Sequence, residues 1–312
     1  MNHISISAII PAYNAEGTVS RALDSVLAQT RLPEEILIVD DCSGDATAIV
    51  AGTYADRGVK TLRLRNRSGA AAARNAGIRA ARGSWIAFLD ADDEWLPGKI
   101  EKQATAIANR PQVSLVFCGS EEFSPEGHSL GDTFRGAPVV VGDEAWKALL
   151  AYNFVSTPTV LAPRKLLLEL GGFDERLKVA EDQDMWVRLA LAGPLAYVPD
   201  PLVRVHVQPN SLSSWSPEDQ TDYTLPMIER HLTALSEQLA ADEVRRIRGA
   251  RLQNAGLINC AHGDLRGGVP PLLRSAFLGY RPARAVRAIV GALVRTGLTR
   301  AAHWTQVGAP RL

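Results

Sequence analysis

Two short apolar runs, at residues 36–39 and 85–89, each pass directly into closely spaced carboxylates, namely Asp40, Asp41, Asp90, Asp92 and Asp93. A short, continuous apolar run is typical of a strand buried on both faces of a parallel sheet. Ligands of open α/β sheets bind outside the carboxyl ends of the strands. The pattern therefore predicts that two strands deliver acids to the edge of the sheet at which such proteins do their chemistry.

Strand-like and helix-like segments alternate through the N-terminal part of the chain. The strand-like apolar runs lie at residues 4–10, 36–39, 60–64, 85–89 and 113–118. Such alternation predicts an α/β fold with a mostly parallel central sheet, right-handed crossovers and flanking helices. From about Ser216 the pattern becomes helical. We therefore expect one α/β domain over residues 1–215 and a helical, Arg-rich region over residues 216–312.

The three carboxylates within residues 90–93 are unusually close in sequence. Carboxylates this close repel one another unless a cation lies among them, and oxygen ligands suit Mg²⁺ or Mn²⁺. The alternative is a strand end with solvated acids that cap a helix beginning near Pro97. By itself this segment leaves both a divalent metal site and a simple helix cap open.

Two further segments carry polar groups that suit a binding site. Residues 68–77 combine small side chains with Arg74, so a ligand could approach a positively charged helix start. A tightly packed Ala-rich helix would have the same composition. Glu181, Asp182 and Asp184 open a later helix, where the helix dipole favours acids without any catalytic role.

The formal net charge is zero, but the charges are distributed unevenly along the chain. From Arg245 to the end there are 12 Arg, no Lys and one acid, Asp264. Residues 285–298 place apolar side chains and arginines on one helix, which suits the surface of an anionic membrane. A helix that covers the core domain would show much the same pattern, so both interpretations are open.

The sequence indicates a cytoplasmic protein. Its three cysteines, Cys42, Cys118 and Cys260, lack metal-type spacing, and their odd number argues against a disulfide framework. The first residues have the pattern of a strand rather than of a signal peptide, and no 18-residue window is uniformly apolar. We expect a cytoplasmic location, with peripheral contact at the inner face of the plasma membrane through the basic helices.

Six short motifs follow one another along the chain: IIPAYN at 9–14, VDDCS at 39–43, ARNAG at 73–77, FLDADD at 88–93, GGFDE at 171–175 and EDQDMW at 181–186. In order and spacing they resemble the family 2 inverting glycosyltransferases, which have the GT-A fold. The resemblance covers roughly residues 4–215. It implies a hexosyltransferase that moves a sugar from a nucleotide sugar, expected to be a UDP-sugar, to the hydroxyl of a glycan or lipid-linked acceptor. Together with the basic amphipathic end of the chain, it leads us to expect a role in bacterial surface polysaccharide or glycolipid synthesis.

The resemblance assigns roles to individual residues. Asp182 would be the catalytic base, with Glu181 and Trp186 supporting the acceptor side. The residues that would bind the donor are Pro11, Ala12, Tyr13, Asn14, Glu16, Asp41, Ala72, Arg74, Asn75, Asp90, Ala91 and Asp92.

A divalent metal, Mn²⁺ or Mg²⁺, would accompany the donor. Asp90 and Asp92 form a DXD motif that would hold it, and His206 resembles a histidine that completes this site in some members of the family. His206 has a structural alternative as a residue at a strand end. A cation neutralises charge on the departing diphosphate, while a carboxylate on the other side of the sugar accepts the proton of the attacking hydroxyl. Such a back-side displacement inverts the anomeric centre.

Departures from the family and competing interpretations narrow the prediction. The Gln-x-x-Arg-Trp motif of processive synthases is absent, which favours a non-processive enzyme. The turn at residues 11–14 is neither a Gly-rich triphosphate loop of a nucleotidyltransferase nor the G-x-G-x-x-G of a dehydrogenase. A nucleic-acid binder would explain the basic end of the chain but not the acidic strand ends. The main alternative is a catalytically inactive GT-A-like protein that binds a nucleotide sugar or a glycan.

Overall fold

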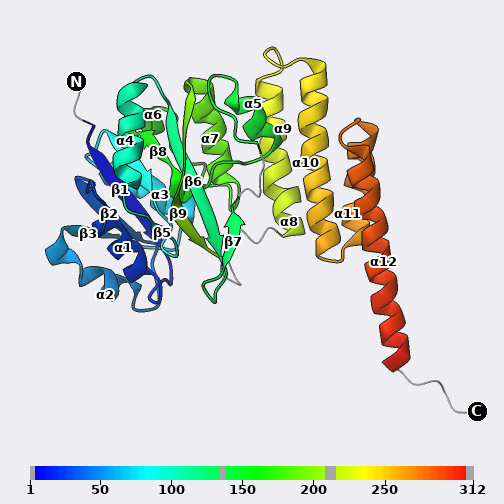
Figure 1. Ribbon diagram of the computed structural model, residues 1–312, viewed down its shortest axis with the longest axis horizontal. Coiled ribbons are helices and arrows are strands. Elements are labelled where there is room, and N and C mark those ends of the chain that lie inside the picture. Colours follow the sequence, from blue (N-terminus) through cyan, green and yellow to red (C-terminus); the bar gives the residue numbers. More distant parts are fainter. Residues whose placement is uncertain (1–3, 134–137, 208–215, 307–312) are drawn as a thin grey trace, which may run out of the picture. The chain divides into compact units, whose positions relative to one another are not determined.

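The computed structural model describes residues 4–133, 138–207 and 216–306 (Figure 1). Side chains are described as far as residue 294. The chain divides into two compact units. The first comprises Met1–Leu149 and Asn153–Ser211, and the second comprises Leu150–Tyr152 and Leu212–Leu312. The expected boundary between residues 215 and 216 adjoins residues 208–215, which lie outside the described residues, and it stays a prediction.

The first unit is built on one sheet with the strand order β3-β2-β1-β4-β8-β6-β9-β5, and β7 pairs with β6. Its strands are β1 (Ile6–Ala12), β2 (Glu35–Asp40), β3 (Val59–Arg63), β4 (Trp85–Phe88), β5 (Glu94–Trp95), β6 (Leu115–Phe123), β7 (Ser129–Asp132), β8 (Leu161–Pro163) and β9 (Leu195–His206). The sheet is parallel from β3 to β4, whereas β8 runs antiparallel to both β4 and β6. The predicted α/β fold is confirmed, with parallel pairing among β1 to β4 and again between β6 and β9.

Helices cover both faces of this sheet. They are α1 (Val19–Leu27), α2 (Thr47–Gly52), α3 (Ala70–Ala80), α4 (Lys99–Asn109), α5 (Ala145–Ala151), α6 (Arg164–Glu169) and α7 (Glu181–Ala192), with short turns η1 (Ala55–Arg57) and η2 (Thr157–Thr159). Ile6 and Ile10 of β1 are fully buried in a core shared with α1 and α4. On the opposite face, a Cβ at Gly77 of α3 would lie 2.6 Å from Ile9 Cγ2. Glycine at this position therefore allows α3 to approach the sheet closely.

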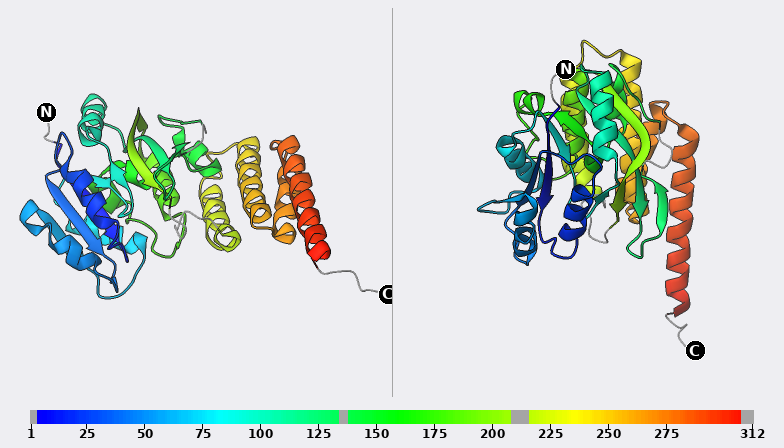
Figure 2. Two further views of the ribbon diagram at one scale, coloured as in Figure 1. Left: turned by 60° about the horizontal axis from the view of Figure 1, so that its bottom comes forward. Right: turned by 60° about the vertical axis from the view of Figure 1, so that its left-hand side comes forward.

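The second unit is helical, as predicted. Its elements are α8 (Pro217–Asp219), η3 (Gln220–Thr224), α9 (Leu225–Ala234), α10 (Ala241–Ala261), α11 (Leu265–Phe277) and α12 (Pro282–Gln306). Helices α10, α11 and α12 lie side by side (Figure 2) around a small core of Cys260, Leu272, Ala285 and Ala292. Among the described residues no helix is long and apolar enough to cross a membrane.

Candidate active site

The carboxyl ends of β2, β1 and β4 lie at one edge of the sheet. Ala12 is paired with Asp40 at the ends of β1 and β2, and Ile9 is paired with Phe88 at the end of β4. These strand ends and the loops that follow them carry the IIPAYN, VDDCS and FLDADD motifs. The parallel register therefore brings the residues predicted to bind the donor to a single edge, which is the usual ligand position in such sheets.

The turn after β1 is tied to the loop after β2. Asn14, which has a left-handed φ of 48°, donates its backbone N–H to Ser43 Oγ at 3.0 Å. Its side-chain Oδ1 accepts from the Gly44 N–H at 2.9 Å. Glu16 Oε2 accepts from the Ala46 N–H at 2.8 Å. Asn14 and Glu16 thus hold the two loops together, whereas donor contact by either side chain stays a prediction.

Asp41 and Tyr13 have contrasting surroundings. Asp41 is buried and accepts hydrogen bonds, each 2.7 Å long, from the backbone N–H groups of Ser68 and Gly69, which fixes the loop that begins α3. Tyr13 is 39% exposed, and the guanidinium carbon of Arg67 lies 4.1 Å from its ring centroid. An exposed aromatic ring beside a cation suits stacking with a nucleobase. Arg67 belongs to none of the sequence motifs, so sequence reasoning did not identify it.

Four further residues that are predicted to bind the donor have small side chains and little exposure. Ala12, Ala72 and Ala91 are buried, and Pro11 is partly buried. Residues of this kind act on a ligand through backbone groups and through the close approach that a small side chain allows. Their roles in donor binding stay predictions.

Arg74 connects two motifs that are far apart in the sequence. Its Nη1 lies 2.7 Å from Glu181 Oε1, across 107 residues, and its Nη2 lies 2.9 Å from Asp90 Oδ1. Burial alone would lower the pKa of this guanidinium, but Asp90 and Glu181 together raise it above its ordinary value. The DXD segment and the start of α7 therefore meet at one buried, positively charged side chain.

The carboxylates after β4 lie in a strongly negative environment. Burial, together with the charge of Asp90, raises the pKa of Asp92 to about 6. Burial and the charges of Asp92 and Asp90 raise the pKa of Asp93 well above its usual range. Arg21 donates to the carbonyl oxygen of Asp92 and not to its carboxylate. A divalent cation among these oxygens would relieve their repulsion, and carboxylate oxygens are the kind of ligand that Mg²⁺ and Mn²⁺ prefer.

His206 lies beside this segment, at the end of β9. Its backbone N–H donates to Asp93 Oδ1 at 2.9 Å, and its Nε2 lies 3.0 Å from Glu94 Oε1. Within the described ranges, no three His, Cys, Asp or Glu side chains surround a common metal position. His206 would have to exchange its contact with Glu94 for the metal, and its ligand role stays a prediction.

Asp182, the predicted base, lies in the first turn of α7. Its Oδ1 accepts from the Gln183 N–H at 2.6 Å, and its Oδ2 accepts from Asn153 Nδ2 at 3.1 Å. Burial, together with the charge of Glu181, raises the pKa of Asp182 to about 7, while Arg74 opposes that rise. A carboxyl group with a pKa near neutrality suits a general base. Asn153 lies in an irregular stretch after α5 that carries no motif, so sequence reasoning missed it.

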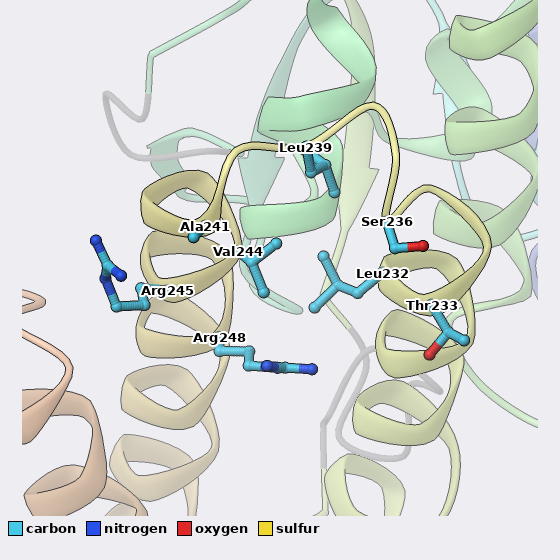
Figure 3. A pocket seen from close by; sticks show the side chains of 8 residues that line it. All are labelled: Leu232, Thr233, Ser236, Leu239, Ala241, Val244, Arg245 and Arg248. Carbon is cyan, nitrogen blue, oxygen red and sulfur yellow. The ribbon is translucent and has the colours of Figure 1, made fainter.

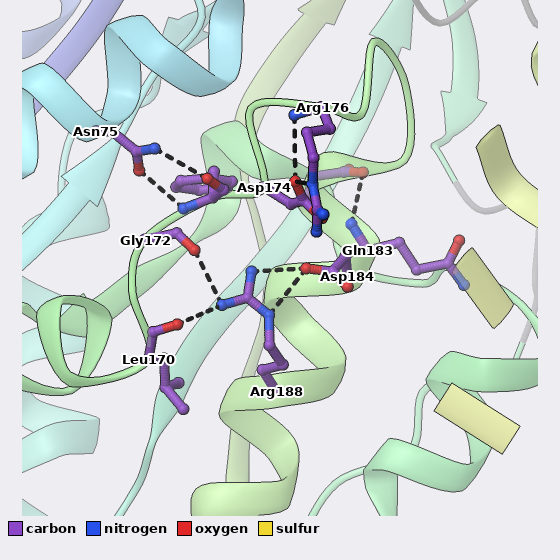
Figure 4. Close-up of polar contacts among 10 residues, drawn as sticks. Asn75, Leu170, Gly172, Asp174, Arg176, Gln183, Asp184 and Arg188 are labelled. Carbon is purple, nitrogen blue, oxygen red and sulfur yellow. Dashed lines mark hydrogen bonds and ion pairs between the residues drawn. The ribbon is translucent and has the colours of Figure 1, made fainter. Parts of the chain in front are cut away.

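The loop before α7 is fastened by Asn75 of α3 (Figure 4). Asn75 Oδ1 accepts from the Phe173 N–H at 2.8 Å, and its Nδ2 donates to Phe173 O at 2.9 Å and to Glu175 Oε1 at 2.8 Å. Gly172 has a φ of 76°, and a Cβ there would lie 2.4 Å from Asn75 Oδ1. The Asn75 amide is thus engaged in positioning this loop, and its contact with a donor stays a prediction.

Arg188 and Trp186, which both lie on α7, hold this helix against the loop before it. Arg188 Nη1 donates to the carbonyl oxygens of Leu170 and Gly172, each at 2.9 Å (Figure 4). Trp186 is fully buried, and its ring centroid lies 5.8 Å from that of Phe173 in an edge-on arrangement. Trp186 therefore stabilises the helix that bears Asp182 through packing, and its support of the acceptor side stays a prediction.

The second unit contains a separate pocket of about 590 Å³ between α9 and α10 (Figure 3). Its apolar lining includes Leu232, Leu239 and Val244. Arg248, which also lines it, forms an ion pair of 2.7 Å with Glu229. None of the residues predicted for donor, metal or base lines this pocket, so the chemistry is assigned to the first unit.

Sequence comparison relates the chain to known glycosyltransferases. The profile described as "Glycosyl transferase family 2" matches residues 7–134. The putative teichuronic acid biosynthesis glycosyltransferase TuaG of Bacillus subtilis is 30% identical over 72% of this chain and 88% of its own length. Succinoglycan biosynthesis protein ExoO of Rhizobium meliloti is 28% identical over 98% and 90%. The Escherichia coli UDP-Glc:alpha-D-GlcNAc-diphosphoundecaprenol beta-1,3-glucosyltransferase WfgD is 43% identical, but over only 38% of this chain and 46% of its own.

Solved structures of glycosyltransferases share the fold. Staphylococcus aureus TarS 1-349 in complex with UDP-GlcNAc aligns with a TM-score of 0.59 at 19% identity, over 88% of this chain and 91% of that one. The mannosyltransferase PcManGT from Pyrobaculum calidifontis, in complex with GDP-Man and Mn²⁺, aligns with a TM-score of 0.63 at 23% identity, over 96% and 83%. At these identities the likeness concerns the fold, and it agrees with the predicted GT-A type.

Proposed function

The chain belongs to glycosyltransferase family 2, and we propose that it transfers single hexosyl groups from a nucleotide sugar to an acceptor hydroxyl, with inversion at the anomeric carbon. The observation that carries this proposal is the double ion pair of Arg74, which joins Asp90 of the DXD segment to Glu181, the neighbour of Asp182. This contact supports the proposal, because it brings a predicted donor-side acid and the neighbour of the predicted base to one buried cation. In a back-side displacement the base and the leaving group act on opposite faces of the sugar, so both must be held within one site.

In this mechanism the protein's own carboxylates have separate tasks. Asp182 accepts the proton of the acceptor hydroxyl as that oxygen attacks the anomeric carbon, and its pKa of about 7 leaves it ionised in a useful fraction of molecules. Asp90 and Asp92 would hold Mn²⁺ or Mg²⁺, and His206 would complete the set. When bound, the divalent ion supplies positive charge that stabilises the departing diphosphate.

A UDP-sugar is the donor that we propose. WfgD is named as a transferase that uses UDP-Glc, and the TarS structure is a complex with UDP-GlcNAc, which supports this choice. PcManGT, in contrast, was solved with GDP-Man. The exposed ring of Tyr13 and the neighbouring Arg67 provide a stacking surface for the base. Asp41, at the end of β2, would contact the ribose.

The donor proposal is tested by thermal unfolding of the protein with UDP, GDP, dTDP and CMP, each with and without Mn²⁺. A ligand that binds only the folded state raises the apparent stability by mass action, by about 2.7 kcal/mol when its concentration is 100-fold above Kd. We expect stabilisation by UDP that depends on Mn²⁺. Equal stabilisation by all four nucleotides, or none by any, would contradict the proposed donor site.

We further propose that the enzyme acts on a lipid-linked acceptor in bacterial surface polysaccharide or glycolipid synthesis, as a peripheral protein at the cytoplasmic face of the membrane. Two relatives, ExoO and TuaG, are named for polysaccharide biosynthesis, which supports this role. The name of WfgD includes a diphosphoundecaprenol-linked acceptor, which supports the lipid-linked acceptor. The surface of α12 supports the location, because apolar side chains on it are more than half exposed, namely Val286, Val290, Leu293 and Val294. Arg284 and Arg287 on the same helix are also exposed and would face anionic lipid headgroups.

Co-sedimentation with vesicles tests this location. We expect the protein to bind vesicles that contain phosphatidylglycerol at low salt, to bind pure phosphatidylcholine weakly, and to dissociate as salt rises, because salt screens the arginines. The double variant Arg284→Glu and Arg287→Glu should reduce binding, while the matched pair Arg57→Glu and Lys165→Glu, in the first unit, should not. Equal binding to neutral and anionic vesicles would contradict an electrostatic contact.

A further inference from the structure

Arg74 occupies an unusual position for a residue expected to touch the donor. It is 5% exposed, and its guanidinium carbon lies 5.5 Å from the ring centroid of Phe173, which comes from the loop before α7. Its two terminal nitrogens are both engaged, one with Glu181 and one with Asp90. The side chain therefore has protein partners on three sides, from segments that lie far apart in the sequence.

We propose that Arg74 is a positioning residue that holds Asp90 and Glu181 on one buried cation, and so aligns the donor-side acid with the helix that bears the base Asp182. This inference rests on the proposed transfer reaction and adds a role that donor binding does not include. Arginine suits this task because its planar guanidinium presents several N–H donors in fixed directions and can serve two carboxylates at once. A lysine ammonium at the same place is a single point charge on a flexible stem.

The same contacts affect the protonation of the base. The charged groups that face Asp182 are Glu181 on its own helix and Arg74 from α3, and its neutral partners are Asn153 and the Gln183 N–H. Glu181 raises the pKa of Asp182 and Arg74 lowers it. Arg74 therefore offsets the negative charge that Glu181 places next to the base, and its loss would leave Asp182 protonated over a wider range of pH.

Asn75, the residue after Arg74, strengthens this geometry. Its amide forms two hydrogen bonds with the backbone of Phe173 and so fixes the loop before α7 to α3. Arg74 binds Glu181, the first residue of α7. Neighbouring residues of one helix thus set both the approach to α7 and its first turn. The polar atoms of Asn75 and the Nη atoms of Arg74 bind protein groups. A positioning role therefore accounts for the place of the ARNAG segment beside the site.

The inference is tested with Arg74→Gln, Arg74→Lys and the double variant Arg74→Gln with Glu181→Gln. We measure donor KM, kcat and the pH dependence of kcat, and we use Mn²⁺-dependent stabilisation by UDP to show that each variant is folded. Arg74→Gln should lower kcat by about tenfold or more, with donor KM within about threefold of the wild type, because an interaction of the catalytic apparatus is lost rather than uniform donor binding. In Arg74→Gln, the acid limb of the kcat–pH profile should move to higher pH.

The other two variants make this result specific. The double variant should return the acid limb toward that of the wild type, because it also removes the charge of Glu181 that raises the pKa of Asp182. Arg74→Lys should keep the wild-type acid limb and lose kcat, because it retains the charge but cannot bridge both acids.

Direct donor binding by Arg74 gives different results. Donor KM would then rise by about tenfold or more in Arg74→Gln with an unchanged pH profile, and Glu181→Gln would not restore the profile. That outcome would overturn the inference and leave the proposed function intact. A wild-type protein that neither binds a nucleotide nor turns over any sugar nucleotide would overturn the proposed function, and the inference with it.

Discussion

Replacing Asp182 by Asn should abolish sugar transfer and leave nucleotide binding intact. Asn has nearly the same shape and can keep a hydrogen bond with Asn153, but it cannot accept the proton of the acceptor hydroxyl. Loss of a general base typically slows a reaction by about 10²- to 10⁴-fold. The measurement is nucleotide release at saturating donor, with UDP stabilisation in the presence of Mn²⁺ as the test of binding.

A suitable control is Asp56→Asn, which makes the same chemical change at an exposed acid in η1. Asp56 lies on the surface and outside every motif of the site, so this change should have little effect on turnover. Retained turnover in Asp182→Asn would mean that another group is the base. Loss of both binding and turnover would mean that Asp182 is required for the structure of the site.

The raised pKa of Asp182 also predicts how pH affects stability and rate. Its folded-state pKa of about 7 lies above the ordinary value of 3.8, so the folded protein binds the proton more tightly than the unfolded chain does. Ionisation of this group therefore lowers stability as pH rises from about 4 to about 7. Asp182→Asn should remove that loss and be more stable than the wild type above pH 7. In the wild type, kcat should rise as pH passes through about 7, where the base becomes ionised.

Replacing Asp92 by Ala should eliminate the Mn²⁺-dependent part of nucleotide binding. Asp92 supplies one of the few carboxylates that can hold a divalent ion beside Asp90, and without the ion the diphosphate would meet a negative site. The free protein should not be destabilised by the change. Burial and the charge of Asp90 already raise the pKa of Asp92 to about 6, so its removal relieves repulsion.

Thermal unfolding with UDP, with and without Mn²⁺, measures both effects of Asp92→Ala. Asp56→Ala is the control, because Asp56 is an exposed acid in η1 and should leave the Mn²⁺ effect unchanged. Full Mn²⁺-dependent stabilisation in Asp92→Ala would contradict the assignment of the DXD segment as the metal site.

The parallel strands, and the acidic residues that follow them, could be predicted from the sequence because the signals are local. The apolar runs at 36–39 and 85–89 became β2 and β4, which flank β1 in the sheet, and their acids follow at the same edge. Local patterns also predicted the helical second unit. These features depend on hydrophobic periodicity and on residues that end strands, both of which are visible in a short window.

Side-chain partners in the site could not be predicted in the same way, because they come from distant segments. The contact of Arg74 with Glu181 spans 107 residues, and Asn153 reaches Asp182 from a stretch without a motif. The motifs singled out Asn14 and Asn75 without indicating that their polar atoms hold loops. Such contacts depend on how loops and helices pack after the sheet has formed, and no periodicity in the sequence records them.

Proton NMR of the first sugar product shows directly whether the transfer inverts the anomeric carbon. The wild-type protein is incubated with Mn²⁺ and an α-linked UDP-hexose, with water or a short glycan as acceptor, and the anomeric signals are followed from the earliest time. We expect the new product to appear as the β anomer, because Asp182 drives a single back-side displacement. Product that first appears as the α anomer would contradict inversion, and the absence of turnover with every donor and acceptor would contradict the proposed transferase.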